Sequence, residues 1–257
     1  GKINYKKTNL DKNNKYLKDF LNIYDLRPIK NNIGGMNIIH LYNLYCVIRK
    51  IKPTMVVESG AYKGLSSWFI LKASPKAKVY CFDTNLNQLE FKSKRIKYFE
   101  RDIKNFNFYN LPKKSLLVLD DHQNQIERLK QSILFGFNYI FFDDDSDDEN
   151  HDFYTIKHQM KKKKFNHVLS ISAIIKNFII FFKLMLKKVF NQFISYTNLE
   201  YRLRDYNYFP SNILLINKYV KKIYSLKINN KFFKKNYPNI YFNKKRNGTN
   251  QTLIVLK

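Results

Sequence analysis

Acidic side chains recur where apolar, strand-like runs of this chain come to an end. The sequence contains 20 acids against 47 lysines and arginines, so chance would more often place a base at such a position. Ligands of open α/β sheets bind beyond the carboxyl ends of the strands, and acids there predict a ligand site along one rim. The five acids are Glu58, Asp83, Asp102, Asp120 and Asp143.

The first of these runs leads into a loop that contains two glycines. In the segment VVESGAYKG, residues 56–64, Gly60 and Gly64 allow backbone to approach a ligand and a helix N-terminus to face it. Asp83 lies 23 residues after Gly60, the spacing of an acid that accepts hydrogen bonds from a nucleotide's ribose. The alternative is a tight strand-to-helix turn without a ligand. No Gly-Lys-Ser/Thr triplet follows the loop, so a phosphate-binding P-loop is not supported.

A second acidic group lies in the segments LVLDDHQNQIERL and YIFFDDDSDDENHD. Ten of the 20 acids fall between Asp120 and Asp152, and such a concentration of negative charge is costly without a cation. Oxygen ligands on adjacent strand ends suit Mg²⁺, which binds a few carboxylates together with water and substrate oxygens. For the tail from Asp147 to Asp152 we expect a solvated loop. His40 is expected to pack within a helix rather than to bind a ligand.

The elements that must position these residues alternate between strand and helix. This alternation predicts a Rossmann-like, doubly wound α/β fold: a mostly parallel sheet with helices on both faces. Strands are expected at residues 55–58, 78–83, 96–99, 116–120, 139–143, 222–228 and 251–256, and helices at 16–24, 36–51, 65–73, 86–95 and 125–135.

The chain is expected to form a single domain over residues 33–257, after a basic N-terminal extension with one helix over residues 1–32. Within the domain, the two last strands are a C-terminal elaboration of the sheet. Residues 151–220 are interpreted as a lid or a substrate-binding insertion.

The segments VVESGAYKGLSS, VYCFD, FERD and LLVLDDH resemble, in this order, the motif series of class I S-adenosylmethionine-dependent methyltransferases, over residues 34–145. The resemblance implies that the glycine loop contacts the methionine part of the cofactor, Asp83 the ribose hydroxyls and Asp102 the adenine. Tyr62 replaces the usual middle glycine of that loop. The implied cofactor-binding residues are Glu58, Gly60, Ala61, Tyr62, Gly64, Ser66, Asp83 and Asp102.

The two acidic segments resemble those of metal-dependent O-methyltransferases that act on sugars and antibiotic glycosides, related to macrocin O-methyltransferase. This resemblance implies that Asp120, Asp143 and Asp144 hold Mg²⁺ or a similar divalent cation. It also implies that His122 is the general base, with Asp121 as the next candidate. The expected activity is methylation of an oxygen on a small hydroxylated acceptor such as a sugar, with S-adenosylmethionine as the donor.

The net charge of +27 leaves other functions open. A compositional bias toward Lys, Asn, Ile, Tyr and Phe explains the charge without a partner, whereas a nucleic-acid methyltransferase explains it by binding phosphates. Against the nucleic-acid alternative, the segment LDDHQ is not of the Asp-Pro-Pro-Tyr type found in enzymes that methylate the amino groups of bases.

A third alternative is a non-catalytic, cofactor-binding protein that acts at a membrane surface or in an assembly through residues 168–195. That apolar segment is interpreted as a core helix, a lid or a membrane-surface helix, since its lysines interrupt any run long enough to cross a membrane. The two cysteines, Cys46 and Cys81, offer no disulfide framework, which favours the cytoplasm, with peripheral membrane contact left open.

Overall fold

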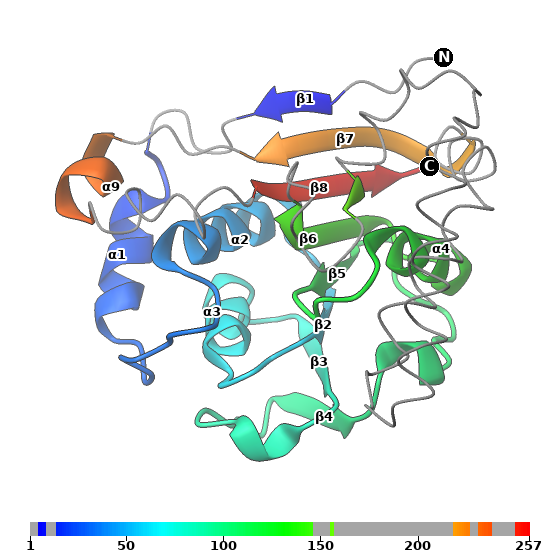
Figure 1. Ribbon diagram of the computed structural model, residues 1–257, viewed down its shortest axis with the longest axis horizontal. Coiled ribbons are helices and arrows are strands. Elements are labelled where there is room, and N and C mark those ends of the chain that lie inside the picture. The colour runs from blue at the N-terminus through cyan, green and yellow to red at the C-terminus, as the bar shows by residue number, and fades with distance from the viewer. Residues whose placement is uncertain (1–4, 9–13, 146–154, 157–217, 227–230, 238–249) are drawn as a thin grey trace, which may run out of the picture.

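A single sheet of eight strands forms the centre of the protein (Figure 1). The computed structural model describes residues 5–8, 14–145, 155–156, 218–226, 231–237 and 250–257. The strand order is β1-β7-β8-β6-β5-β2-β3-β4; β8 is antiparallel to both of its neighbours, and all other neighbours are parallel. The strands are β1 (Tyr5–Thr8), β2 (Met55–Ser59), β3 (Lys78–Asp83), β4 (Ile96–Glu100), β5 (Ser115–Leu119), β6 (Tyr139–Asp145), β7 (Val220–Leu226) and β8 (Asn250–Leu256).

The central strands are apolar because helices cover both faces of the sheet. Every residue of β2 and β5 is buried, as expected for parallel strands between two helical layers. Alternate residues face opposite layers: Val56 packs with α1, α2 and α3, whereas Val57 packs with α4. Figure 1 shows these helices on opposite sides of the sheet. The helices are α1 (Leu17–Asp25), α2 (Ile38–Ile51), α3 (Leu65–Ala73), α4 (Gln125–Phe135) and α9 (Lys231–Asn236).

Local capping residues determine where the helices next to the rim begin and end. The Asn37 side chain accepts hydrogen bonds from the first amides of α2, and Asn124 does the same for α4. Gly136 ends α4 in a left-handed conformation, φ 83°, which suits a residue without a Cβ atom. The Asn124 cap thus fixes the junction between the loop after β5 and α4.

The chain order reverses between β2 and β5. From β2 the chain continues through α3 to β3 on one side, whereas β5 lies on the other side of β2. In doubly wound sheets the crevice at such a reversal, beyond the carboxyl ends of the strands, is where ligands bind. Backbone hydrogen bonds from Gly60 N to Phe82 O and from Asp120 N to Ser59 O, both 2.9 Å, tie the strand ends together there.

The doubly wound α/β fold predicted from the sequence is confirmed, including both C-terminal strands. The predicted helix at residues 86–95 is wrong: only a 3₁₀ turn, η1 (Leu86–Gln88), forms there. The amides of Glu90 and Phe91 instead donate to the carbonyl oxygen of Lys63, so this segment lies along the glycine loop. Strand β1, which pairs with β7, adds an element to the N-terminal extension that the sequence did not predict.

Among the described residues, no helix has both the length and the apolar character needed to cross a bilayer. Residues 157–217 lie outside the described residues, so the interpretations of segments 151–220 and 168–195 stay predictions.

Candidate active site at the switch point

The two glycines of the loop after β2 are required by neighbouring backbone. Gly60 has φ 87°, and a Cβ atom on it would lie 2.8 Å from the backbone nitrogen of Asp121 and still closer to the carbonyl group of Asp120. Gly64 has φ 90°, and a Cβ atom there would lie 2.8 Å from the carbonyl oxygen of Phe91. The room that we expected a ligand to use at Gly60 is therefore filled by the loop after β5.

Asp83 ends β3 beside this loop, as its spacing predicted. Its Oδ2 accepts hydrogen bonds from the backbone N–H groups of Ala61 (2.9 Å) and Tyr62 (3.1 Å), and its Oδ1 accepts one from Asn85 N (2.9 Å). The carboxylate holds the loop against the next strand of the sheet.

Glu58 lies beneath the glycine loop rather than in it. Its side chain is 0% exposed, and Oε2 accepts a hydrogen bond from the hydroxyl of Ser67 in the first turn of α3. Burial raises the pKa of Glu58 to about 7, with a smaller contribution from Asp83, while hydroxyls of Ser66 and Ser67 oppose the shift. The same burial, with Glu58 nearby, raises the pKa of the Cys81 thiol. In this conformation Glu58 supports the loop from below, and a contact with a cofactor stays a prediction.

Tyr62 joins the glycine loop to the turn before α2. Its backbone is left-handed, φ 50°, and its hydroxyl donates a hydrogen bond of 3.2 Å to the carbonyl oxygen of Ile33. Lys63, the next residue, donates 3.1 Å from its Nζ to the carbonyl oxygen of Asn31. The residue that departs from the glycine pattern thus makes a contact that a glycine would not make.

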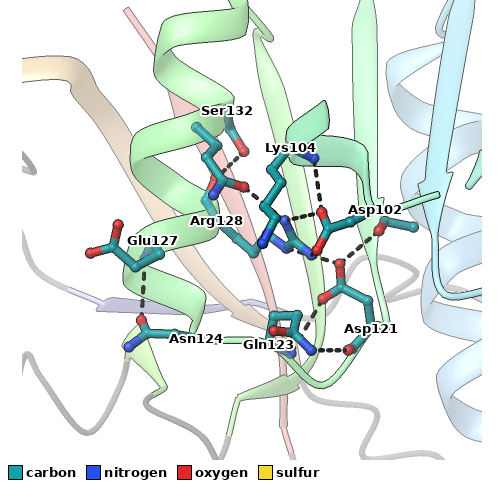
Figure 2. Close-up of polar contacts among 10 residues, drawn as sticks. Asp102, Lys104, Asp121, Gln123, Asn124, Glu127, Arg128 and Ser132 are labelled. Carbon is teal, nitrogen blue, oxygen red and sulfur yellow. Dashed lines mark hydrogen bonds and ion pairs between the residues drawn. The ribbon is translucent and has the colours of Figure 1, made fainter. Parts of the chain in front are cut away.

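A buried arginine connects the loops after β4 and β5 (Figure 2). Arg128 of α4 is 4% exposed; its Nη1 and Nη2 donate to the two carboxylate oxygens of Asp102 at 2.8 and 3.1 Å. Its Nε lies 2.9 Å from Asp121 Oδ2, in an ion pair without hydrogen-bond geometry. Burial alone would lower the pKa of Arg128, but Asp121 and Asp102 raise it overall, so the guanidinium is charged.

The two aspartates of this network differ in pKa. For Asp102, burial acts to raise the pKa, but hydrogen bonds from Arg128 and from Lys104 N, together with their charges, lower it overall. For Asp121, burial dominates and raises the pKa, although Arg128 and the hydrogen bond from Ser59 Oγ (2.6 Å) oppose it. Asp121 is therefore held by Ser59 and Arg128 through the same carboxylate oxygen, Oδ2.

A small pocket opens at the ends of β5 and β6. Asp120, His122 and Asp144 each place a ligand atom within 4.8 Å of the others, a spacing at which they could hold a metal ion. His122 has a left-handed backbone, φ 53°; its side chain is 57% exposed, and Nδ1 lies 3.7 Å from Asp144 Oδ2. Burial, followed by the charges of Asp143 and Asp144, raises the pKa of Asp120 well above its usual range. The pocket is lined by Leu119, Asp120, Asp121, His122, Gln123, Gln125, Arg128, Phe142 and Asp144.

Asp143 is turned away from that pocket. His40 Nδ1 lies 3.1 Å from Asp143 Oδ2, and the side-chain amide of Gln251 donates to Asp143 Oδ1. His40, Asp143 and Asp144 form a second group with metal-ligand spacing, whereas Asp120, Asp143 and Asp144 do not form one among the described residues. His40 is buried in α2, as expected of a packing residue, and in addition it contacts Asp143. His40 and Asp143 are 103 residues apart, and no local sequence signal joins them.

No protein-family model matches the chain, and no curated protein matches it. Among solved structures, the SAM-bound O-methyltransferase TomG of Streptomyces achromogenes is 10% identical over 96% of this chain and 91% of its own, with a TM-score of 0.45. The SAH-bound methyltransferase PaMTH1 of Podospora anserina is 10% identical over 96% and 92%, with a TM-score of 0.46. A Mg- and SAM-bound form of CmcI is 15% identical over 46% of this chain and 58% of its own, with a TM-score of 0.37. At these identities and TM-scores the likenesses decide neither the family nor the function of this chain.

Proposed function

We propose that this chain is an S-adenosylmethionine-dependent methyltransferase that acts on an oxygen of a small hydroxylated acceptor such as a sugar. The observation that carries the proposal is the rim at the switch point. There the loop around Gly60 follows β2, Asp83 ends the next strand beside it, and the acids of β5 and β6 lie across the reversal of chain order. This places a nucleotide-type site and an acidic pocket at neighbouring strand ends.

Asp83 is suited to hold the ribose of the cofactor. A carboxylate offers about four acceptor positions, and three backbone N–H groups already donate to that of Asp83. These bonds fix the carboxylate, and the remaining position can accept from a ribose hydroxyl without rearrangement of the loop. Preorganisation of this kind lowers the entropic cost of binding.

His122 is the proposed proton acceptor. When bound, the cofactor would supply an electrophilic methyl group to the acceptor oxygen, and the electron pair of its carbon–sulfur bond would remain on sulfur. The hydroxyl proton is assigned to His122, which is exposed at the pocket, whereas Asp121 is held by Ser59 and Arg128. Holding the acceptor in line with the methyl group contributes most of the remaining rate enhancement.

Asp120 and Asp144 would hold a divalent cation. Their carboxylates are in one group with metal-ligand spacing and both line the pocket, and Mg²⁺ is commonly held by one or two carboxylates together with water and substrate oxygens. When bound, the cation would make an acceptor hydroxyl more acidic. Asp143 is not in this group, and its two carboxylate oxygens contact His40 and Gln251 instead.

The proposal is tested by calorimetric titration of the protein with S-adenosylhomocysteine, followed by methyl transfer from labelled S-adenosylmethionine to a panel of sugars. We expect micromolar binding, about −8 kcal/mol, with no binding of NAD or ATP at the same concentrations. Labelled product should form with Mg²⁺ or Mn²⁺ and not with excess chelator. A protein that binds NAD or ATP but not S-adenosylhomocysteine is not a methyltransferase of this kind.

A further inference from the structure

The proposed reaction makes no use of Arg128, although this buried residue pairs with two carboxylates at the rim. One guanidinium contacts carboxylates from the loops after two strands, β4 and β5, which are not neighbours in the sheet. Its Nη1 also donates 2.8 Å to Gln131 Oε1 on the same helix. Figure 2 shows Arg128 of α4 lying between Asp102 and Asp121.

The exposure of the pair indicates which partner meets a ligand. The side chain of Arg128 is 5% exposed, whereas that of Asp102 is 20% exposed, so the carboxylate faces outward with the guanidinium behind it. Asp102 follows β4, the strand beyond β3 on the rim, and Asp83 at the end of β3 is the proposed ribose acceptor. A nucleoside anchored at Asp83 with its base directed away from the switch point would bring the base toward Asp102.

We propose that Arg128 is a positioning residue that fixes Asp102 as an acceptor for the exocyclic amino group of the cofactor's base, and thereby makes the pocket selective for adenine. This inference rests on the proposed function. Adenine presents an amino group at its C6 edge, where hypoxanthine presents an oxygen. An ionised carboxylate is an acceptor only, so it binds the amino group and repels the oxygen.

Arg128 supplies two things that Asp102 cannot supply alone. The two-pronged hydrogen bond sets the plane of the carboxylate, which a point charge such as the ammonium of lysine does not do. The guanidinium also opposes the effect of burial and lowers the pKa of Asp102, which keeps the carboxyl group from becoming a donor. Without Arg128, a carboxyl group that rotates or takes up a proton would accept either base.

The test compares calorimetric affinities for S-adenosylhomocysteine and for S-inosylhomocysteine, its hypoxanthine analogue. The variants are Arg128→Gln, Asp102→Asn and the double variant, with Arg128→Lys as a charge-preserving form. Lys130→Gln is the matched control, because Lys130 lies on the same helix and pairs with Glu127 at 2.6 Å in a partly exposed ion pair. Thermal unfolding of each variant confirms that it is folded.

We expect the parent to prefer the adenine ligand by roughly 10- to 100-fold, the range for one hydrogen bond to a charged group. Arg128→Gln and Asp102→Asn should each remove most of that preference, the double variant should remove no more than either, and Lys130→Gln should keep it. If Arg128→Gln does not fold, Arg128→Lys should still show a reduced preference.

Three results would overturn the inference: a parent that binds both ligands equally, a folded Arg128 variant that keeps the full preference, or losses from Arg128→Gln and Asp102→Asn that add. Each is distinct from failure of the proposed function, in which the parent binds neither ligand.

Discussion

The acids in the two halves of the rim are held by different kinds of partner. On the β2–β3 side, Glu58 and Asp83 are held by a hydroxyl and by backbone N–H groups, which carry no formal charge. On the β4–β5–β6 side, Asp102 and Asp121 share a guanidinium, and Asp143 is held by an imidazole and a carboxamide. The first arrangement suits the binding of a neutral ribose. On the second side, Asp102 with Arg128 serves the proposed contact with the base, and the pocket of Asp120 and Asp144 suits charge that must be balanced during a reaction.

This difference predicts separable effects. Changes on the β2–β3 side should alter cofactor affinity or loop stability and leave the response to metal ions intact. Changes in the acidic pocket should abolish turnover while the cofactor still binds. Gly60 lies where the two halves meet, since its missing side chain lets the loop after β2 contact the loop after β5.

The largest expected effect is on turnover in the acidic pocket. His122→Asn, chosen because asparagine tolerates the left-handed backbone at this position, should lower turnover about 10²- to 10⁴-fold and leave S-adenosylhomocysteine affinity unchanged. Asp144→Asn should lose more activity at limiting Mn²⁺ than Asp143→Asn, because only Asp144 lies with Asp120 and His122. Steady-state methyl transfer and calorimetry measure the two quantities. An active His122→Asn enzyme would move the base elsewhere, and equal losses from both aspartate variants would return Asp143 to the metal site.

Where the two halves meet, Gly60→Ala should lower the free energy of unfolding by roughly 3–5 kcal/mol. This is the sum of the cost of a strained backbone and that of a clash with the backbone of Asp120. Gly136→Ala is the matched control: its φ is 83°, but a Cβ atom there has nothing within 4 Å, so only the backbone cost of about 1 kcal/mol applies. Urea denaturation gives both values. Equal destabilisation by the two substitutions would mean that the loops after β2 and β5 are not in contact as described.

Much of the β2–β3 half could be predicted from the sequence, because its contacts are made by nearby residues. Helices α3 and α4 have the predicted bounds, since Gly64, Asn124 and Gly136 mark their ends locally. Asp83 contacts amides about 22 residues before it, the distance that one strand-helix-strand unit spans. The spacing between the glycine loop and Asp83 was therefore enough to predict that the two lie together.

The acidic half depends on contacts that no local pattern encodes. Gln251 and Asp143 are 108 residues apart, and Asp121 meets Ser59 across 62 residues. The pattern at residues 86–95 is helical, but tertiary hydrogen bonds to Lys63 hold that segment in another conformation. The sequence thus identified which acids reach the rim but not which of them are already paired there.

On the β2–β3 side, the buried acid should make stability depend on pH. The pKa of Glu58 is about 7 in the folded protein against an ordinary 4.5, so the folded state binds the proton more tightly than the unfolded chain does. Its contribution is fully present below pH 4.5 and is lost as the pH rises through 7, by roughly 3 kcal/mol in total. Glu58→Gln has no ionisable group at this position and serves as the reference. The unfolding free energy of the parent minus that of the variant should therefore fall between pH 4 and pH 8, as measured by urea denaturation, and parallel curves would show that Glu58 stays ionised in the fold.

The smallest expected effect is on cofactor affinity, through Asp83 in the β2–β3 half. Asp83→Asn should weaken S-adenosylhomocysteine binding by roughly 1–3 kcal/mol, because an amide replaces a carboxylate that accepts from three N–H groups and is the proposed acceptor for the ribose. Glu100→Gln is the control, since Glu100 pairs with Asp83 in the sheet register and accepts a long hydrogen bond, 3.3 Å from Leu86 N. Its affinity should match the parent. Turnover of Asp83→Asn at saturating cofactor should also match the parent, because the acidic pocket across the switch point is unchanged. Loss of turnover under saturation would mean that the two halves of the rim act as one site rather than as a binding half and a catalytic half.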